Sequence, residues 1–224
     1  MNQTTDKYFE KDFWIKENRL YAEPNFRLRK CATIINQLAE DRDCDLLDVG
    51  CGPAALRQLL NQNIHYYGID IALHESASYL LETDFGRSPI DFGGRTFDFV
   101  VALGVFEYMG DRQAEKFREI RRLLKPCGKF LMSYINFGHF RRRIFPIYNN
   151  IQSYDEMKAD IEHVFRIDQT FPVSHHWRHK QPGKNALPNL QLRMHRNIPL
   201  VSSWLAVEYF FICSLPASLR SITN

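Results

Sequence analysis

Two patterns of apolar residues alternate along the chain, and together they predict an α/β protein. Short, nearly continuous apolar runs, such as the one from Asp45 to Val49, are typical of buried parallel strands. Apolar residues at spacings of three and four, such as Leu56, Leu59 and Leu60, are typical of helices packed on such a sheet. This periodicity predicts strands over 45–49, 64–70, 80–85, 97–104, 130–135, 164–173 and 204–214, and helices over 26–39, from the glycine turn to about 60, 112–124 and 153–163.

The turn after the first strand is the strongest sign of a ligand site. Gly50 and Gly52 have no Cβ and adopt positive φ easily, so a ligand can lie against bare backbone. The turn follows the carboxyl end of a strand, where open α/β sheets bind their ligands. Asp48 precedes the first glycine by two residues. Its carboxylate repels a pyrophosphate and attracts an ammonium or sulfonium group, which argues against a nicotinamide dinucleotide.

At these residues the chain resembles the class I S-adenosylmethionine (SAM) dependent methyltransferases, whose first motif reads D/E-x-G-x-G. The segments 97–100 (FDFV) and 124–128 (LKPCG) match two further motifs, and the likeness spans 44–136. The resemblance implies an enzyme with a Rossmann-like, seven-stranded, mostly parallel sheet in the order 3-2-1-4-5-7-6, with helices on both faces. It also implies SAM as the cofactor and S-adenosylhomocysteine as its product.

Two carboxylates downstream are candidates for binding the nucleoside part of SAM. Asp70 ends the second strand about 20 residues past the glycine turn, where an acid accepts both ribose hydroxyls, although a solvated acid is the alternative. The resemblance places Asp84 at the adenine amino group and Phe85 on the ring, although an Asp that forms a turn before Gly86 looks the same. The predicted cofactor residues are Asp48, Gly50, Cys51, Gly52, Asp70, Ile71, Asp84, Phe85, Leu103 and Gly104.

A second group of residues consists of candidates for binding the methyl acceptor. His139 follows the fifth strand and is the candidate base or orienting group, although a structural role is the alternative. Arg141, in an arginine run, either holds an anionic group of the substrate, or lies in a solvated segment or contacts a partner. The segment 136–140 is similar to part of the methionine-biosynthesis protein W family. Candidate substrate residues are Tyr21, Arg27, Tyr134, Asn136, Arg141, His175 and His176.

One motif position departs from the family. Val105-Phe106-Glu107-Tyr108 stands where related enzymes carry a leucine, an acid and a histidine. Tyr108 replaces the histidine, so a reaction step that depends on that histidine is not expected here.

Composition and charge narrow the class of protein. The 224 residues, 45% hydrophobic and with a formal net charge of +3, fit one globular domain and do not indicate nucleic-acid binding. Five scattered cysteines without C-x-x-C spacing predict reduced thiols and no metal site. No signal peptide or membrane span is expected, and the predicted location is the cytoplasm. We expect a cap or lid over 1–25, and a methyltransferase domain over 26–224 with an insertion at about 174–200.

The predicted reaction is methyl transfer from SAM to an oxygen or nitrogen atom of a small molecule, which carries an anionic group if Arg141 contacts it. Three alternatives stay open: a non-catalytic partner protein that keeps the SAM fold, an RNA methyltransferase, and a nicotinamide oxidoreductase. Asp48 disfavours the last. Leu103-Gly104-Val105-Phe106, in place of an N-P-P-Y-type motif, disfavours the second.

Overall fold

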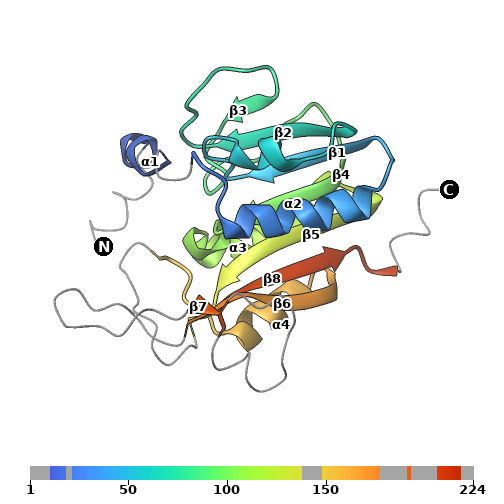
Figure 1. Ribbon diagram of the computed structural model, residues 1–224. Coiled ribbons are helices and arrows are strands. Elements are labelled where there is room, and N and C mark those ends of the chain that lie inside the picture. The colour runs from blue at the N-terminus through green and yellow to red at the C-terminus, as the bar shows by residue number, and fades with distance from the viewer. Residues whose placement is uncertain (1–10, 19–21, 138–147, 177–190, 193–205, 218–224) are drawn as a thin grey trace.

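One mixed β-sheet organises the protein (Figure 1). The computed structural model describes residues 11–18, 22–137, 148–176, 191–192 and 206–217. Eight strands of these residues form the sheet in the order β3-β2-β1-β4-β5-β8-β6-β7. The strands are β1 (Cys44–Val49), β2 (Ile64–Asp70), β3 (Leu80–Glu82), β4 (Phe97–Leu103), β5 (Leu124–Ile135), β6 (Arg166–His176), β7 (Gln191–Leu192) and β8 (Ala206–Ser214).

The topology confirms the predicted strand order. Strands β3, β2, β1, β4 and β5 pair in parallel, and β8 lies antiparallel between β5 and β6. The two-residue β7 adds to the far edge by pairing with the end of β6. If the short β7 is left out and β8 is counted as the seventh strand, the order is 3-2-1-4-5-7-6, as the resemblance implies.

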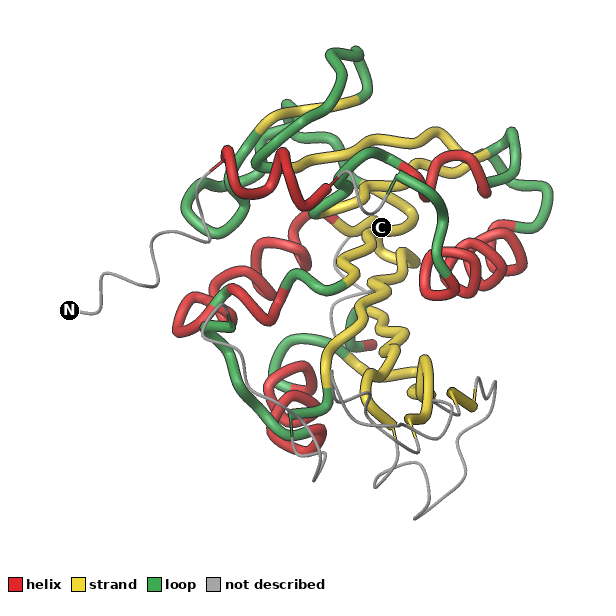
Figure 2. The backbone as a smooth tube through the Cα atoms, turned by 60° about the vertical axis from the view of Figure 1, so that its left-hand side comes forward, coloured by secondary structure: helices red, strands yellow, loops and turns green. Residues whose placement is uncertain are grey.

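Helices cover both faces of the sheet, as Figure 2 shows. Successive residues of a strand point to opposite faces, so Leu46 joins one buried cluster and Leu47 the other. The first cluster contains α2 (Phe26–Ala39) and the 3₁₀ helix η3 (Ala55–Leu59), and the second contains α3 (Gln113–Leu123) and α4 (Tyr154–Glu162). The remaining helices of the described residues are α1 (Lys11–Asn18), η4 (Phe106–Tyr108) and η5 (Gly110–Arg112).

Local capping explains where two helices begin. The side chain of Asn25 accepts a hydrogen bond from the backbone N–H of Leu28 at the start of α2. Ser153 and Glu156 form a complete capping box at the start of α4, at the residue that the sequence predicted. Both helices then bury apolar side chains against the sheet.

Several predicted boundaries were wrong. The helix after the glycine turn is the five-residue η3 rather than an α-helix to about 60, because Ala54 adopts a left-handed conformation and the chain is extended again at Leu60. Strand β3 ends at Glu82, before Asp84. Strand β5 begins at Leu124 instead of 130, and a register shift opposite Phe97 accommodates the extra residues.

Two further features concern the outer part of the molecule. Strand β6 continues to His176, so it runs into the segment expected to be an insertion, most of which lies outside the described residues. None of the helices in the described part of the chain combines the length and the apolar character that crossing a membrane requires.

Candidate functional site

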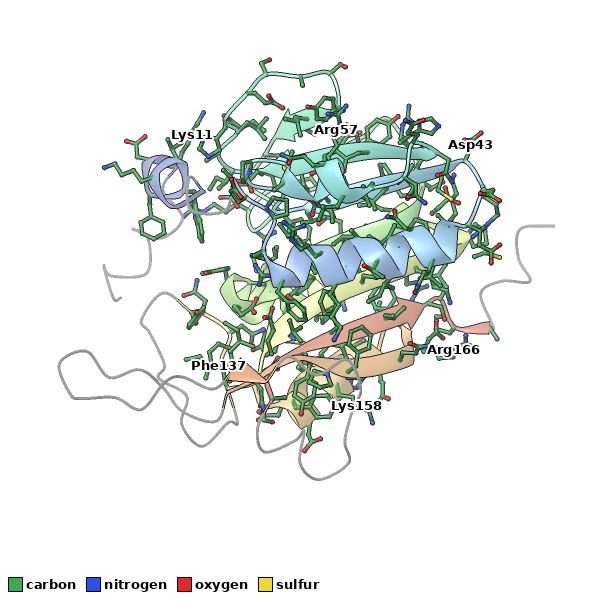
Figure 3. The ribbon with its side chains drawn as sticks, in the orientation of Figure 1. Lys11, Asp43, Arg57, Phe137, Lys158 and Arg166 are labelled. Atoms are coloured by element: carbon green, nitrogen blue, oxygen red, sulfur yellow. The ribbon has the colours of Figure 1, made fainter. Side chains whose placement is uncertain are left out.

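The carboxyl ends of the parallel strands meet at one edge of the sheet. Figure 3 shows Phe137, which follows β5, at the edge that faces α1 and Lys11, whereas Asp43, which precedes β1, lies at the opposite edge. Lys11 anchors α1 there through an exposed ion pair of 2.6 Å with Glu82 at the end of β3. In open α/β sheets this carboxyl edge is where ligands bind.

A cavity of about 300 Å³ opens at this edge, at the lower end of the range for small-molecule sites. All ten residues predicted to bind the cofactor line it, and so does Arg27. Residues that the sequence did not assign to the site also line it: Trp14, Asn25, Leu28, Pro53, Ala55, Ile69, Thr83, Gly86, Val105, Glu107, Tyr108, Met109, Ile135 and Tyr148.

Two glycines keep the cavity open where the backbone passes closest to neighbouring side chains. Gly50 has a φ of +71°, and a Cβ added there would lie 2.6 Å from Cγ2 of Val105. Gly104, at the end of β4, has a φ of +73°, and a Cβ there would lie 2.7 Å from Nη1 of Arg27. A side chain at either position would be strained by the positive φ, and at position 50 it would also clash with Val105.

Asp70 is fixed by the backbone around it. Its Oδ2 accepts a hydrogen bond of 2.8 Å from the N–H of Gly52, and its Oδ1 accepts one of 3.0 Å from the N–H of Ala72. The side chain is buried and lines the cavity. These two hydrogen bonds hold the carboxylate in a fixed orientation at the cavity wall.

Asp48 is buried more deeply, at 4% exposure, on the neighbouring strand. Its Oδ2 accepts a hydrogen bond of 2.9 Å from the hydroxyl of Tyr66. Burial raises the pKa of Asp48 to about 7, and the charge of Asp70 adds to this effect, while the Tyr66 hydrogen bond and Arg27 oppose it. A positively charged ligand beside Asp48 would compensate the cost of its ionised form.

Asp84 and Phe85 lie in a turn just past β3. The side chain and the carbonyl of Asp84 both accept hydrogen bonds from the N–H of Arg87. Asp84 therefore does form a turn, which is the alternative that the sequence left open. Asp84 also lines the cavity. The Phe85 ring is buried and lies 4.8 Å from Nζ of Lys116, which holds the turn by donating to the carbonyl of Ser88.

Glu107 is the functional candidate that the sequence reasoning missed. It lines the cavity, is 1% exposed, and its Oε1 accepts a hydrogen bond of 3.0 Å from the N–H of Ile135. Burial raises the pKa of Glu107 to about 7; the charge of Glu208 adds to this effect and that of Arg27 opposes it. The available signal was an acid within the apolar run that follows the end of β4 at Leu103.

Three predicted substrate residues have described side chains. Arg27 lines the cavity and donates from Nη1 to Glu208 of β8 at 3.0 Å. Tyr134 is buried, donates its hydroxyl to the carbonyl of Asn150 and accepts from the N–H of Gln152, so it holds a loop. Asn136 donates its side-chain N–H to the carbonyl of Ala206. Neither Tyr134 nor Asn136 lines the cavity, so a role for them in binding the acceptor stays a prediction.

The other acceptor candidates cannot be placed. Tyr21, His139 and Arg141 lie outside the described residues. The backbone of His175 and His176 pairs with Leu192 and Gln191 of β7, but their side chains lie outside the described part of the structure.

The charge of the cavity decides which ligand it suits. Among the described residues that line it, four carboxylates (Asp48, Asp70, Asp84 and Glu107) face one cation, Arg27, whose charge already pairs with Glu208. A ligand with positive charge and a sugar diol fits this donor and acceptor set, whereas a pyrophosphate does not.

The sequence was compared with known families and proteins. A family model described as a methyltransferase domain matches residues 21–181, which is more than half of the chain. The comparison with curated proteins finds no match.

Solved structures share the fold at low sequence identity. The N-methyltransferase NodS from Bradyrhizobium japonicum WM9, in complex with S-adenosyl-L-homocysteine, is 13% identical with a TM-score of 0.58 over 92% of this chain and 98% of its own. A SAM-dependent methyltransferase from Clostridium acetobutylicum ATCC 824 is 12% identical, with a TM-score of 0.58 over 90% and 96%. A match in a complex of the Trm112 methyltransferase activator with a putative methyltransferase, from Haloferax volcanii, is 18% identical, with a TM-score of 0.55 over 84% and 91%.

Proposed function

Because the chain belongs to the methyltransferase-domain family, we propose that this cavity holds SAM and that the enzyme methylates an oxygen or nitrogen atom of a small molecule. SAM is the cofactor of the enzyme, and when bound it supplies a methyl group already activated by a positively charged sulfur. The protein itself binds SAM and the acceptor, orients them toward each other, and excludes water from the site.

Each part of the cavity has a distinct role in this proposal. Asp70, which two backbone N–H groups hold at the cavity wall, accepts hydrogen bonds from the two ribose hydroxyls. Asp84 and Phe85 hold the adenine. Asp48 and the 50–52 turn, with Leu103 and Gly104 of β4, surround the positively charged methionyl part.

The observation that carries the proposal is the pair of buried carboxylates at adjacent strand ends, Asp48 on β1 and Asp70 on β2. Both line the same cavity. Burying two acids at neighbouring positions has an energetic cost, because each carboxylate loses contact with water. A cationic nucleoside offsets that cost with its charge and its hydroxyl groups.

The test is calorimetric titration of the protein with SAM and with S-adenosylhomocysteine, with NAD as the control ligand. Replacing Asp70 with Asn should weaken SAM binding by about 10-fold to 100-fold, since it removes a charged acceptor from two hydrogen bonds. Asp98→Asn is the matched control, because Asp98 is a partly buried carboxylate at the opposite end of the sheet, bonded to Lys125 and to the N–H of Asp45. Preference for NAD, or equal SAM affinity in Asp70→Asn and wild type, would refute the proposal.

The dimensions and the charge of the cavity favour a small-molecule acceptor over RNA. The negative charge around the cavity disfavours an RNA backbone, which basic residues would have to hold. Adding an RNA oligonucleotide and small acids, phenols and amines to an assay for S-adenosylhomocysteine release distinguishes these acceptors. An anionic substrate group held by Arg141 stays a prediction, because Arg141 lies outside the described residues.

The N-terminal segment contributes a side chain to the cavity wall. Trp14 of α1 lines the cavity and packs edge-on against Tyr108, with ring centroids 5.3 Å apart. We propose that residues 1–25 act as a lid over the site of the domain formed by 26–224, and that about 174–200 is an insertion. We also propose a cytoplasmic location, because all five cysteines are free thiols.

A further inference from the structure

We propose that the part of the cavity around Glu107, with the rings of Trp14, Tyr108 and Tyr148, binds an organic amine as the methyl acceptor. This inference rests on the proposed function, because it assigns a substrate class to the same site. Three independent features carry it: the contacts of the Glu107 carboxylate, the rigidity of its surroundings, and the aromatic side chains beside it.

The Glu107 carboxylate has one oxygen with a hydrogen-bond partner and one without. Oε1 accepts from the N–H of Ile135, whereas Oε2 is buried and has no hydrogen-bond partner among the described residues. A buried acceptor without a donor costs about 1 to 3 kcal/mol, more if it is charged. A ligand N–H is the donor that would complete this carboxylate.

The backbone around Glu107 holds the carboxylate in place. The carbonyl of Glu107 accepts hydrogen bonds of 3.0 Å from the N–H groups of both Asn149 and Asn150. The side chain of Asn150 donates to the carbonyl of Phe106 at 3.3 Å, and the Tyr134 hydroxyl binds the same loop. Tyr148 is brought to the cavity by this loop, so the site is preorganised by contacts between η4, β5 and the loop.

Three aromatic side chains, Trp14, Tyr108 and Tyr148, line the same cavity as Glu107. Tyr108 packs against Trp14 of α1 and lies 5.8 Å, between ring centroids, from Tyr148. Tyr148 in turn packs against Phe137 with centroids 5.1 Å apart. Aromatic faces attract ammonium groups, and a carboxylate beside them supplies the counter-charge.

The charges that face Glu107 favour an amine over an acid. Arg27 of α2 and Glu208 of β8 act on the carboxylate, and these two side chains pair with each other at 3.0 Å. A substrate carboxylate would meet net negative charge here, while a hydroxyl would bring no positive charge. The protonated amine balances the charge of Glu107.

Glu107 can also take up the proton that an amine must lose before it acts as a nucleophile. The ammonium nitrogen gives one proton to Oε2, which leaves a neutral amine with its lone pair and a neutral carboxylic acid, so charge is conserved. Burial raises the pKa of Glu107 to about 7, which brings it closer to the pKa of an amine than an ordinary carboxyl group.

The test uses two sets of three probes, and the members of a set share one carbon skeleton. One set is benzylamine, benzyl alcohol and benzoate, and the other is phenethylamine, phenethyl alcohol and phenylacetate. Each is titrated calorimetrically into wild-type protein saturated with S-adenosylhomocysteine. We expect the amines to bind more tightly than their alcohols and acids. Binding of neither amine, or tighter binding of the alcohols or acids, overturns the proposal.

Matched variants separate this inference from the proposed function. Glu107→Gln, which keeps the Oε1 acceptor and the side-chain shape, should weaken amine binding by about 30-fold or more and change S-adenosylhomocysteine affinity by less than about twofold. Tyr148→Leu should weaken amine binding by about 3-fold to 30-fold, and Tyr148→Phe should restore it. Equal amine affinity in wild type and Glu107→Gln refutes the amine site alone. Failure of S-adenosylhomocysteine to bind the wild type refutes the proposed function.

Discussion

Replacing Asp48 with Asn should make the ligand-free protein more stable and the SAM complex weaker. The side chain is 4% exposed, and burial is the main reason why its pKa is raised to about 7. Asn has nearly the same shape and still accepts the hydrogen bond from the Tyr66 hydroxyl. The substitution therefore removes a buried charge and leaves the packing unchanged.

The expected size follows from the two pKa values. The folded protein holds the Asp48 proton more tightly than the unfolded chain, so the free energy of unfolding falls as the pH rises from about 4 to about 7. One pKa unit corresponds to about 1.4 kcal/mol, so above pH 7 the ionised Asp48 lowers the free energy of unfolding by roughly 4 kcal/mol. The advantage of Asp48→Asn over wild type should grow by about 3 kcal/mol between pH 5 and pH 8.

Urea denaturation of both proteins at pH 5, 6, 7 and 8 measures this difference. Glu107, whose pKa is also raised to about 7, is present in both proteins, so its contribution cancels. Calorimetric titration at pH 8 measures the affinity for SAM. Asp48→Asn should bind SAM at least about 10-fold more weakly than wild type, because a nearby counter-charge is lost.

Asp98→Asn again serves as the control, since it breaks an ion pair of 2.6 Å with Lys125 and should not stabilise the protein at any pH. The reasoning about Asp48 is refuted if the stability difference between Asp48→Asn and wild type does not increase with pH. It is also refuted if the variant binds SAM as tightly as wild type does.

Two further predictions concern the walls of the cavity. Gly50→Ala should lower the free energy of unfolding by about 1 to 2 kcal/mol because of the positive φ, and by a further amount because the new Cβ would lie 2.6 Å from Val105. Adding Val105→Ala should recover the second loss but not the first. Thermal unfolding of the single and double variants measures both contributions. Trp14→Ala should speed the dissociation of S-adenosylhomocysteine in stopped-flow measurements, because Trp14 lines the cavity. Phe13→Ala is the control on the same helix and should have a smaller effect, because Phe13 does not line the cavity. Equal effects of the two substitutions would contradict the proposal that this segment is a lid.

The sequence by itself determined most of the sheet, and it predicted cofactor residues that the structure places around one cavity. Alternating runs of apolar residues predict buried strands from local periodicity alone, and seven strands with the expected order are present. Asp48, Gly50 and Asp70 could be predicted to lie together because each occupies a fixed position relative to a strand end. The carboxyl ends of neighbouring parallel strands always meet, so residues at those ends reach the same cavity.

Boundaries and helix type were less predictable. The pattern of Leu56, Leu59 and Leu60 suits any helix with one apolar face, and only the left-handed backbone of Ala54 and the short path to β2 made η3 a 3₁₀ helix. Asp84 illustrates the same limit, because its hydrogen bonds to the Arg87 N–H and its place at the cavity depend on how the turn after β3 folds back.

Only the tertiary structure brings together the residues of the proposed acceptor site. Arg27 and Glu208 pair across 181 positions of the sequence, and Trp14, Glu107 and Tyr148 come from three segments with no shared motif. Tyr134 looked like a site residue, yet its hydroxyl holds a loop in the core. Periodicity records which side of an element is buried but not which distant segment covers it, and that choice follows from packing of the whole chain.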